Sequence, residues 1–311
     1  MRIVFMGTPT FAVPCLRVLA EAYEVVAVVT QPDRPSGRGK KLTPSPVKTA
    51  AVALGIPVMQ PESVRNEDFH QELAALSLDF IITAAYGKIL PPFLLAIPTV
   101  GALNIHASLL PRHRGAAPIH RAIMAGDKES GITIMHMDKG MDTGDMVVRE
   151  SIPIEAGDTT GILHDKLAIL GAQLITAAIK AITDGNAQRI PQDHNLATYA
   201  APLTRAEEQI GWHHSAQVID QQVRGMNPWP GAYTYWNQLR LKVWAGKITA
   251  ACGTPSGAVM AVDGGLLVAT GGGAYLITEL QLPGKKAMSA TDFLRGNAVT
   301  AGTVLGKTDL M

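Results

Sequence analysis

The stretch Leu103-Asn-Ile-His-Ala-Ser-Leu-Leu-Pro111 lies at the centre of the predicted fold. Leu103 to Ala107 is apolar and follows turn residues, which predicts a short strand. Because side chains alternate along a strand, Asn104, His106 and Ser108 are expected to share one face. Open α/β sheets bind ligands at the carboxyl ends of their strands, where an amide and an imidazole could stabilise an oxyanion and move a proton. A strand ending in a polar turn, with His106 as a hydrogen-bonded buried histidine, explains the same residues.

Predicted strands and helices alternate in the residues before this stretch, which indicates a mostly parallel α/β sheet. The turn after the first strand, Gly7 to Val13, lacks the G-x-G-x-x-G fingerprint, so NAD is not expected. The strands are Arg2–Met6, Val25–Val29, Ile56–Met59, Asp79–Ala85 and Leu103–Ala107, and the helices are Phe11–Ala22, one ending at Ala50–Leu54, and Leu73–Leu78.

The residues after this stretch predict a helix over Gly115–Ala125, with Pro118 in its first turn. Two antiparallel strands, Ile132–Met137 and Met146–Ile152, follow, and a long helix runs from Thr159 to Ile182. The loop between the two strands is acidic and contains glycine. It is consistent with an ordinary hairpin turn and with a site that holds the Asp142 carboxylate over Asn104 and His106, and the pattern does not decide between them.

The composition shifts near Asp184, where a polar segment containing Pro191 predicts a linker. We therefore divide the chain into a Rossmann-like domain over 1–189, a linker over 190–206 and a carboxy-terminal domain over 207–311. A helix is expected over Glu207–Gly225. Short strands separated by glycine turns then predict a small antiparallel barrel, with strands at Ala232–Trp236, Arg240–Trp244, Gly257–Val262, Gly265–Ala269 and Tyr275–Leu282.

A basic segment, Arg34 to Lys48, connects the second predicted strand to the next helix. It contains five basic residues and no acidic residue. Its two glycines and three prolines argue against a helix or a sheet strand. The segment exceeds the usual connection of about 2–6 residues. Its length and charge favour contact with phosphates over a merely solvated surface loop.

The composition narrows the classes of protein to consider. A hydrophobic fraction of 47%, a charged fraction of 17% and a net charge of +1 are ordinary for a globular protein, so any nucleic-acid contact must come from a local patch. The two cysteines are far apart, which fits a reducing compartment and no zinc site. We expect no signal peptide and no membrane helix, hence a cytoplasmic protein, and a monomer.

Several motifs in this chain resemble those of a known family. The motif Asn104-x-His-x-Ser-Leu-Leu-Pro111, then Arg114-Gly-Ala-Ala-Pro118, then Asp142, is similar to the 10-formyltetrahydrofolate-dependent formyltransferases. Further motifs, in the family's order along almost the whole chain, resemble its methionyl-tRNA formyltransferase branch. They are Phe5-Met-Gly-Thr-Pro9, Phe11-Ala-Val-Pro14, Gln31-Pro-Asp-Arg34, Gly37-Arg-Gly-Lys40, Ser45-Pro-Val-Lys48, Ala85-Tyr-Gly87, Ile89-Leu-Pro91, Ala197-Thr-Tyr-Ala200, Asn227-Pro-Trp-Pro230 and Leu282-Pro-Gly284.

The resemblance implies an OB-like carboxy-terminal barrel that helps to bind tRNA. It also implies transfer of a formyl group from 10-formyltetrahydrofolate to the α-amino group of methionine on initiator tRNA, without a metal. Asn104, His106 and Asp142 would be catalytic. The folate-binding residues would be Ser108, Leu109, Leu110, Pro111, Lys88, Ile89, Leu90, Lys139 and Gly140. The tRNA-binding residues would be Arg34, Arg38, Lys40, Lys41 and Lys48, with Arg38 as the central one.

Four positions depart from the family pattern. His113 replaces a usual Trp, His120 a common Gln, Pro202 a usual Lys and Gly211 an Asp. They bear on tRNA docking more than on the chemistry, because none belongs to the predicted catalytic trio. His106, His113 and His120 recur every seven residues, but the intervening prolines argue against one helix that would gather them around a metal.

Two alternative functions remain open from the sequence. One is a formyltransferase of the same family that acts on a small amine, although such an enzyme would not require the basic segment together with the barrel. The other is an RNA-binding protein with a relic transferase site, against which the intact trio argues. In the predicted reaction Asn104 and His106 would donate to the tetrahedral oxyanion, and Asp142 would relay the proton.

Overall fold

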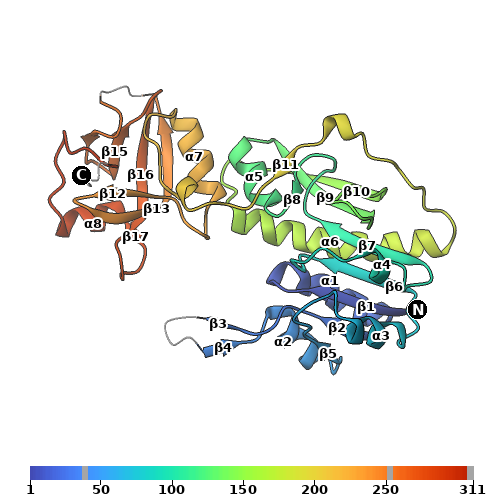
Figure 1. Ribbon diagram of the computed structural model, residues 1–311. Coiled ribbons are helices and arrows are strands. Elements are labelled where there is room, and N and C mark those ends of the chain that lie inside the picture. Colours follow the sequence, from blue (N-terminus) through green and yellow to red (C-terminus); the bar gives the residue numbers. More distant parts are fainter. Residues whose placement is uncertain (37–40, 251–254, 307–311) are drawn as a thin grey trace. The chain divides into compact units, whose positions relative to one another are not determined.

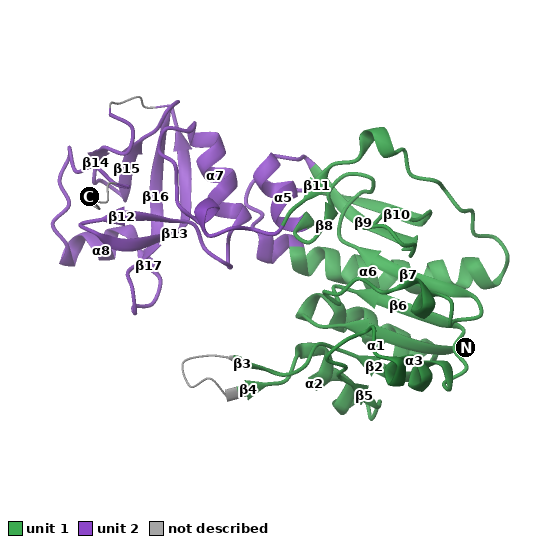
Figure 2. Cartoon of the chain, viewed as in Figure 1, with its two compact units in different colours: residues 1–118, 129–153, 164–201 green, residues 119–128, 154–163, 202–311 purple. Residues whose placement is uncertain are grey.

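The computed structural model describes residues 1–36, 41–250 and 255–306. The chain forms two compact units (Figure 2). Unit 1 consists of Met1–Pro118, Glu129–Pro153 and His164–Ala201, and unit 2 consists of Ile119–Lys128, Ile154–Leu163 and Pro202–Met311. Each unit is thus assembled from several chain segments.

Unit 1 is built on a seven-stranded sheet in the order β10-β9-β7-β6-β1-β2-β5 (Figure 1). The strands from β7 to β5 are parallel, and β9 and β10 extend the sheet in antiparallel fashion. This confirms the predicted mostly parallel α/β sheet. The strands are β1 (Arg2–Gly7), β2 (Glu24–Val29), β5 (Val58–Met59), β6 (Phe80–Ala84), β7 (Gly101–His106), β9 (Glu129–His136) and β10 (Met146–Pro153).

Helices cover both faces of this sheet, because its central strands are almost wholly apolar and buried. Phe69 of α3 and Leu94 of α4 pack with Val4 and Ala102 on one face. On the other face α6 approaches β7 so closely that a Cβ on Gly171 would lie 3.0 Å from Ile105 Cγ2. The helices up to residue 183 are η1 (Thr10–Ala12), α1 (Val13–Ala22), α2 (Pro46–Ala53), α3 (Glu67–Ala74), α4 (Pro92–Leu95), α5 (Pro118–Ala125) and α6 (Thr160–Thr183).

Helix α6 is long and apolar enough to cross a membrane by length and composition, and it is the one helix of the described residues with this property. Half of its apolar window is buried within the protein. Leu167, Ile175 and Ile179 are buried on its inner side. Its apolar character therefore reflects packing against the sheet.

The basic segment differs from its prediction, because it contains strands and the start of a helix. Strand β3 (Arg34–Ser36) pairs with β4 (Lys41–Thr43) as an antiparallel ribbon. A two-stranded ribbon has an open edge, which tolerates Pro35 because proline lacks only the ladder donor. Pro46 occupies the first turn of α2, where its missing N–H costs nothing, and Ser45 caps that helix by accepting from the Lys48 amide.

Two predicted helices have different bounds, and the helix expected over Leu73–Leu78 is α3 (Glu67–Ala74), which begins earlier and ends before Leu78. The residues after Ala74 leave the helix, and Leu78 is buried ahead of β6. The predicted helix over Glu207–Gly225 is wrong in its first half, since η3 (Ala206–Glu208) is separate and α7 (Ala216–Gly225) begins after the Ser215 cap. Ser215 accepts from the Val218 amide, so the chain starts a new helix there.

Unit 2 contains a six-stranded antiparallel sheet in the order β12-β13-β16-β15-β14, with β17 paired to β16. This sheet curls as a half-barrel around a core that includes Trp212, Val243, Tyr275 and Phe293, which agrees with the predicted carboxy-terminal strands. Its elements are β12 (Tyr233–Trp236), β13 (Leu239–Thr249), β14 (Val259–Ala261), β15 (Leu266–Ala269), β16 (Ala274–Gln281), β17 (Met288–Ser289) and α8 (Ala290–Gly296).

Candidate active site

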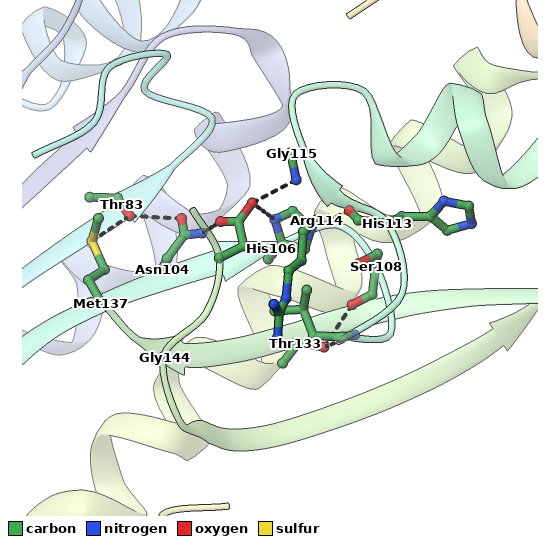
Figure 3. Close-up of polar contacts among 12 residues, drawn as sticks. Thr83, Asn104, His106, Ser108, His113, Arg114, Gly115, Thr133, Met137 and Gly144 are labelled. Atoms are coloured by element: carbon green, nitrogen blue, oxygen red, sulfur yellow. Dashed lines mark hydrogen bonds and ion pairs between the residues drawn. The ribbon is translucent and has the colours of Figure 1, made fainter. Parts of the chain in front are cut away.

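Asn104 and His106 lie at the carboxyl end of β7, and the neighbouring strand β6 orients the first of them. Thr83 faces Asn104 in the parallel register, and its hydroxyl donates to Asn104 Oδ1 at 2.8 Å. Because the Thr83 hydroxyl binds the amide oxygen, the NH₂ group of Asn104 points away from Thr83. That group points to Asp142, with Asn104 Nδ2 3.4 Å from Asp142 Oδ1 (Figure 3).

The imidazole of His106 is buried between a carbonyl and a carboxylate. Nε2 lies 3.0 Å from the carbonyl oxygen of His113, and because a carbonyl only accepts, Nε2 must carry a proton. Nδ1 lies 3.6 Å from Asp142 Oδ2, an ion-pair distance. The Nε2–H group is therefore held by His113, and Nδ1 faces the Asp142 carboxylate.

Asp142 reaches both side chains from the loop between β9 and β10. Its backbone has φ +54°, a left-handed conformation that is uncommon outside glycine. The Gly115 amide donates to Asp142 Oδ2 at 2.8 Å (Figure 3). The carboxylate thus has a donor on each oxygen, from Asn104 and from Gly115, and its orientation is fixed before any substrate binds.

Gly115 belongs to a short parallel pair of strands beside Asp142. Strand β8 (Arg114–Gly115) pairs with β11 (Tyr199–Ala200), which comes from the segment predicted as a linker. Gly115 has φ +119°, and a Cβ there would lie 2.9 Å from the Ala200 carbonyl oxygen. Glycine is needed at this position because the backbone approaches Ala200 closely and is left-handed.

The arrangement brings an amide donor, an imidazole and a carboxylate to one strand end. The two N–H groups nearest the carboxylate could instead turn to a developing oxyanion, and Asp142 could then accept a proton. The geometry is therefore suited to acyl transfer onto an amine. The described residues contain no group of three or more His, Cys, Asp or Glu side chains able to hold a metal ion.

The predicted folate strip, residues 108–111, is a turn in which most polar groups are already paired. The Ser108 hydroxyl is buried and donates to the Arg112 carbonyl at 2.6 Å. Thr133 accepts from the Leu110 amide and donates to the Ser108 carbonyl, and Leu110 packs with Met135 and Met146. A ligand at this strip would therefore be recognised by the shape of the turn more than by free polar groups.

The other predicted folate residues lie in two loops. Lys88 donates to the carbonyls of Glu62 and Pro61, at 2.6 and 3.3 Å, while Ile89 is 65% exposed and Leu90 is buried in the core. The Gly140 amide donates to Asp138, and Lys139 beside it is exposed. Of these residues, Ile89 presents the largest free apolar surface.

Tyr86 precedes these loop residues and is buried. Burial raises the pKa of its hydroxyl to about 12, so the group is neutral at physiological pH. Within the described part of the chain its hydroxyl oxygen has no hydrogen-bond partner.

The structure describes three of the five predicted tRNA-binding residues, and they lie on three different elements. Arg34 is exposed on β3 and Lys41 begins β4, whereas Arg38 and Lys40 lie outside the described residues. Lys48 is in α2, where its ammonium lies 2.6 Å from Asp33 Oδ2 and 2.7 Å from Gln60 Oε1. Hydrogen bonds from Lys48 and Gln60 lower the pKa of the Asp33 carboxyl.

Three contributors to the site were not predicted from the sequence. Gln192 contacts the Asp142 loop from the segment interpreted as a linker, the Gly115 amide holds Asp142, and Thr83 orients Asn104. Thr83 could have been found, since it lies near the carboxyl end of the predicted strand Asp79–Ala85. The departure at His113 leaves the site intact, because His113 contributes its main-chain carbonyl.

Comparison with known proteins identifies the class of protein to which the chain belongs. The formyl transferase family model matches residues 1–179, and the model of the formyl transferase C-terminal domain matches residues 202–298. Solved structures share the fold. They include the sugar 3N-formyl transferase WlaRD (TM-score 0.67, 17% identity, 92% of this chain and 99% of that chain) and HypX from Aquifex aeolicus in complex with tetrahydrofolic acid (0.62, 17%, 94% and 47%).

The chain therefore belongs to the formyl transferase family. Among its full-length relatives, the methionyl-tRNA formyltransferase of Pelotomaculum thermopropionicum is 50% identical over 99% of both chains. The methionyl-tRNA formyltransferase of Bacillus subtilis is 51% identical over 98% of both chains. These relatives match the branch that the sequence motifs resemble.

Proposed function

We propose that this enzyme transfers the formyl group of 10-formyltetrahydrofolate to the α-amino group of methionine on initiator methionyl-tRNA, in preparation for translation initiation. The convergence of Asn104, His106 and Asp142 at the end of β7 carries the proposal. The names of the full-length relatives support the acceptor, and the folate-bound fold neighbour supports a folate co-substrate.

The reaction requires a neutral amine as nucleophile. The pKa of a free α-amino group is about 7.7–8.0, so a useful fraction is neutral at cellular pH. The amine nitrogen forms a bond to the formyl carbon, and the carbonyl electrons move to oxygen. Asn104 Nδ2 and His106 Nδ1 donate to this oxyanion, and one such donor is worth about 2.7–4 kcal/mol in comparable sites.

Collapse of the tetrahedral intermediate breaks the bond between the formyl carbon and N10 of the folate. The attacking nitrogen loses a proton and N10 gains one, so the step balances. Asp142 accepts and returns this proton, directly or through water, because its two oxygens face Asn104 and His106. No metal takes part in this scheme.

The folate is proposed to bind along residues 108–111, beside Lys88–Leu90 and the loop with Lys139 and Gly140. The tRNA is proposed to contact the basic segment, with Arg38 as its central residue, and the carboxy-terminal domain over 207–311. We expect a cytoplasmic monomer in which 190–206 connects the two domains.

One experiment separates this function from its rivals. The protein is incubated with 10-formyltetrahydrofolate and, separately, with charged initiator tRNA, charged elongator tRNA or small amines such as glycinamide ribonucleotide and amino sugars. Formylation of the initiator tRNA alone is expected. Formylation of a small amine instead would overturn the acceptor, and tRNA binding without any formylation would support an RNA-binding protein with a relic site.

A further inference from the structure

Gln192 lies 50 residues from Asp142 in the sequence and is 5% exposed. Its Nε2 donates to the carbonyl of Asp142 at 2.9 Å and to the carbonyl of Gly144 at 2.8 Å. Its Oε1 accepts from Arg114 Nε at 3.1 Å and from Arg114 Nη2 at 2.6 Å. Both donors and both lone pairs of the amide are thus used.

These partners permit one orientation of the amide. Carbonyls only accept and a guanidinium only donates, so a flipped Gln192 would place like groups against each other at all four contacts. The guanidinium of Arg114 is itself almost completely buried and also contacts His194. Gln192 therefore cannot rotate without removing the amide acceptor of a buried guanidinium and the donor of both carbonyls.

The contacts form a closed ring around Asp142. Gly115 holds the carboxylate of Asp142 through its amide, and the adjacent Arg114 holds Gln192, which holds the carbonyl of Asp142. Left-handed backbone at a non-glycine residue is strained and persists where its surroundings enforce it. The ring supplies such surroundings, because it holds Asp142 by its side chain and by its main chain at once.

We propose that Gln192 is a positioning residue for the reaction: it clamps the left-handed Asp142 loop so that the carboxylate faces Asn104 and His106. The proposal deepens the proposed function and rests on it. Gln192 touches no reacting atom and acts through the main chain of residues 142–144. The segment predicted as a linker thereby becomes part of the catalytic unit.

The test substitution is Gln192→Glu in the full-length protein. The carboxylate retains acceptors for Arg114, so the buried cation keeps its partner, but it can no longer donate to the two carbonyls. Gln188→Glu is the matched control, because Gln188 is exposed on the same segment and the substitution adds the same charge. The kinetic constants for both substrates, folate binding and thermal unfolding are measured for wild type and both variants.

We expect Gln192→Glu to remain folded and to lower kcat by about 10- to 10²-fold, the loss that a small misplacement of a catalytic group produces. KM for each substrate should stay within about threefold, since the groups that bind the substrates are unchanged. A folded variant with the kcat of the Gln188→Glu control, or one that raises KM alone, would overturn the positioning role. Gln192→Asn is the second variant, because it keeps the amide but is too short to span both sets of partners.

If both variants at Gln192 fail to fold, Gln192 is a folding determinant and the proposal is overturned. Failure of the proposed function has a different signature, because wild type itself would then not formylate charged initiator tRNA. An active wild type with an active, folded Gln192→Glu variant refutes the clamp alone.

Discussion

The candidate catalytic centre at the end of β7 and the Asp33–Lys48 pair at the base of the β3–β4 ribbon are both polar clusters in unit 1, but their charged groups are paired differently. In the centre, Asp142 faces an imidazole at 3.6 Å and an amide nitrogen at 3.4 Å, longer than the best hydrogen bonds. At the ribbon base, Lys48 and Asp33 are 2.6 Å apart. The imidazole and the amide of the first cluster are therefore available to another partner, whereas Lys48 and Asp33 in the second cluster are paired with each other.

This difference indicates which basic side chains of the segment are available to bind phosphate. Lys48 is part of the same basic segment as Arg34 and was predicted to bind tRNA with it. Its charge is already opposed by Asp33, and Gln60 accepts a further hydrogen bond from it. We therefore propose that Lys48 supports the ribbon from α2, and that phosphate binding belongs to the other cations of the basic segment. Variants in both clusters test this contrast.

Removal of any member of the trio should have the largest effect. Asn104→Ala, His106→Ala and Asp142→Ala should each lower kcat by at least about 10²-fold, because an oxyanion donor or the proton relay is removed. Double variants should lose little beyond the worse single variant, since the groups act as a unit. Single-turnover formylation measures this, with His70→Ala on α3 as the control. Near-normal turnover of His106→Ala at saturating substrates would refute its assigned role.

Thr83→Val should have an intermediate effect on the centre. Valine has nearly the same shape but cannot donate to Asn104 Oδ1, so the amide loses the bond that orients it. We expect kcat to fall by about tenfold, equivalent to about 1.4 kcal/mol and within the range of one hydrogen bond. Thr83→Ser keeps the hydroxyl and should retain most of the activity. Equal rates for the valine and serine variants would contradict this orienting role.

The other cations of the basic segment should affect tRNA use without affecting folate binding. For each phosphate that is no longer neutralised, the dependence of log affinity on log salt should flatten by about 0.7–0.9. Neutralising Arg38, Lys40 and Lys41 together should therefore reduce the slope clearly, and Lys48→Met should change it least. Titrations of charged initiator tRNA at several salt concentrations provide the measurement. A slope change for Lys48→Met as large as that for Arg38→Ala would return Lys48 to the phosphate-binding set.

The smallest predicted effect concerns pH. The pKa of Asp33 is lowered in the folded protein, so its contribution to stability is complete above the ordinary Asp value of about 3.9 and is lost as pH falls through the lowered pKa. Asp33→Asn should thus lower Tm slightly at neutral pH, and the difference from wild type should vanish in acid. A difference in Tm that persists unchanged below the lowered pKa would rule out this ion pair as its source.

Much of the fold follows from local pattern. Apolar runs of strand length alternating with helices predicted the parallel sheet, and alternation along β7 predicted that Asn104 and His106 share a face, because side-chain direction depends only on neighbouring backbone. The predictions failed where a cap or an edge mattered: Ser215 starts α7, and the open edge of the ribbon accepts Pro35.

The amino-acid pattern was sufficient for the family motifs, for most strands of the two main sheets and for the two side chains at the end of β7. Three-dimensional packing was needed to establish that the Asp142 carboxylate lies beside these two side chains. It also established that Gly115 hydrogen-bonds the side chain of Asp142, that Gln192 hydrogen-bonds its main-chain carbonyl, and that Asp33 pairs with the Lys48 ammonium. These contacts join residues separated by 15 to 50 positions. Periodicity describes neighbours along the chain, whereas such partners depend on how loops are folded over the sheet, so no local pattern contains them.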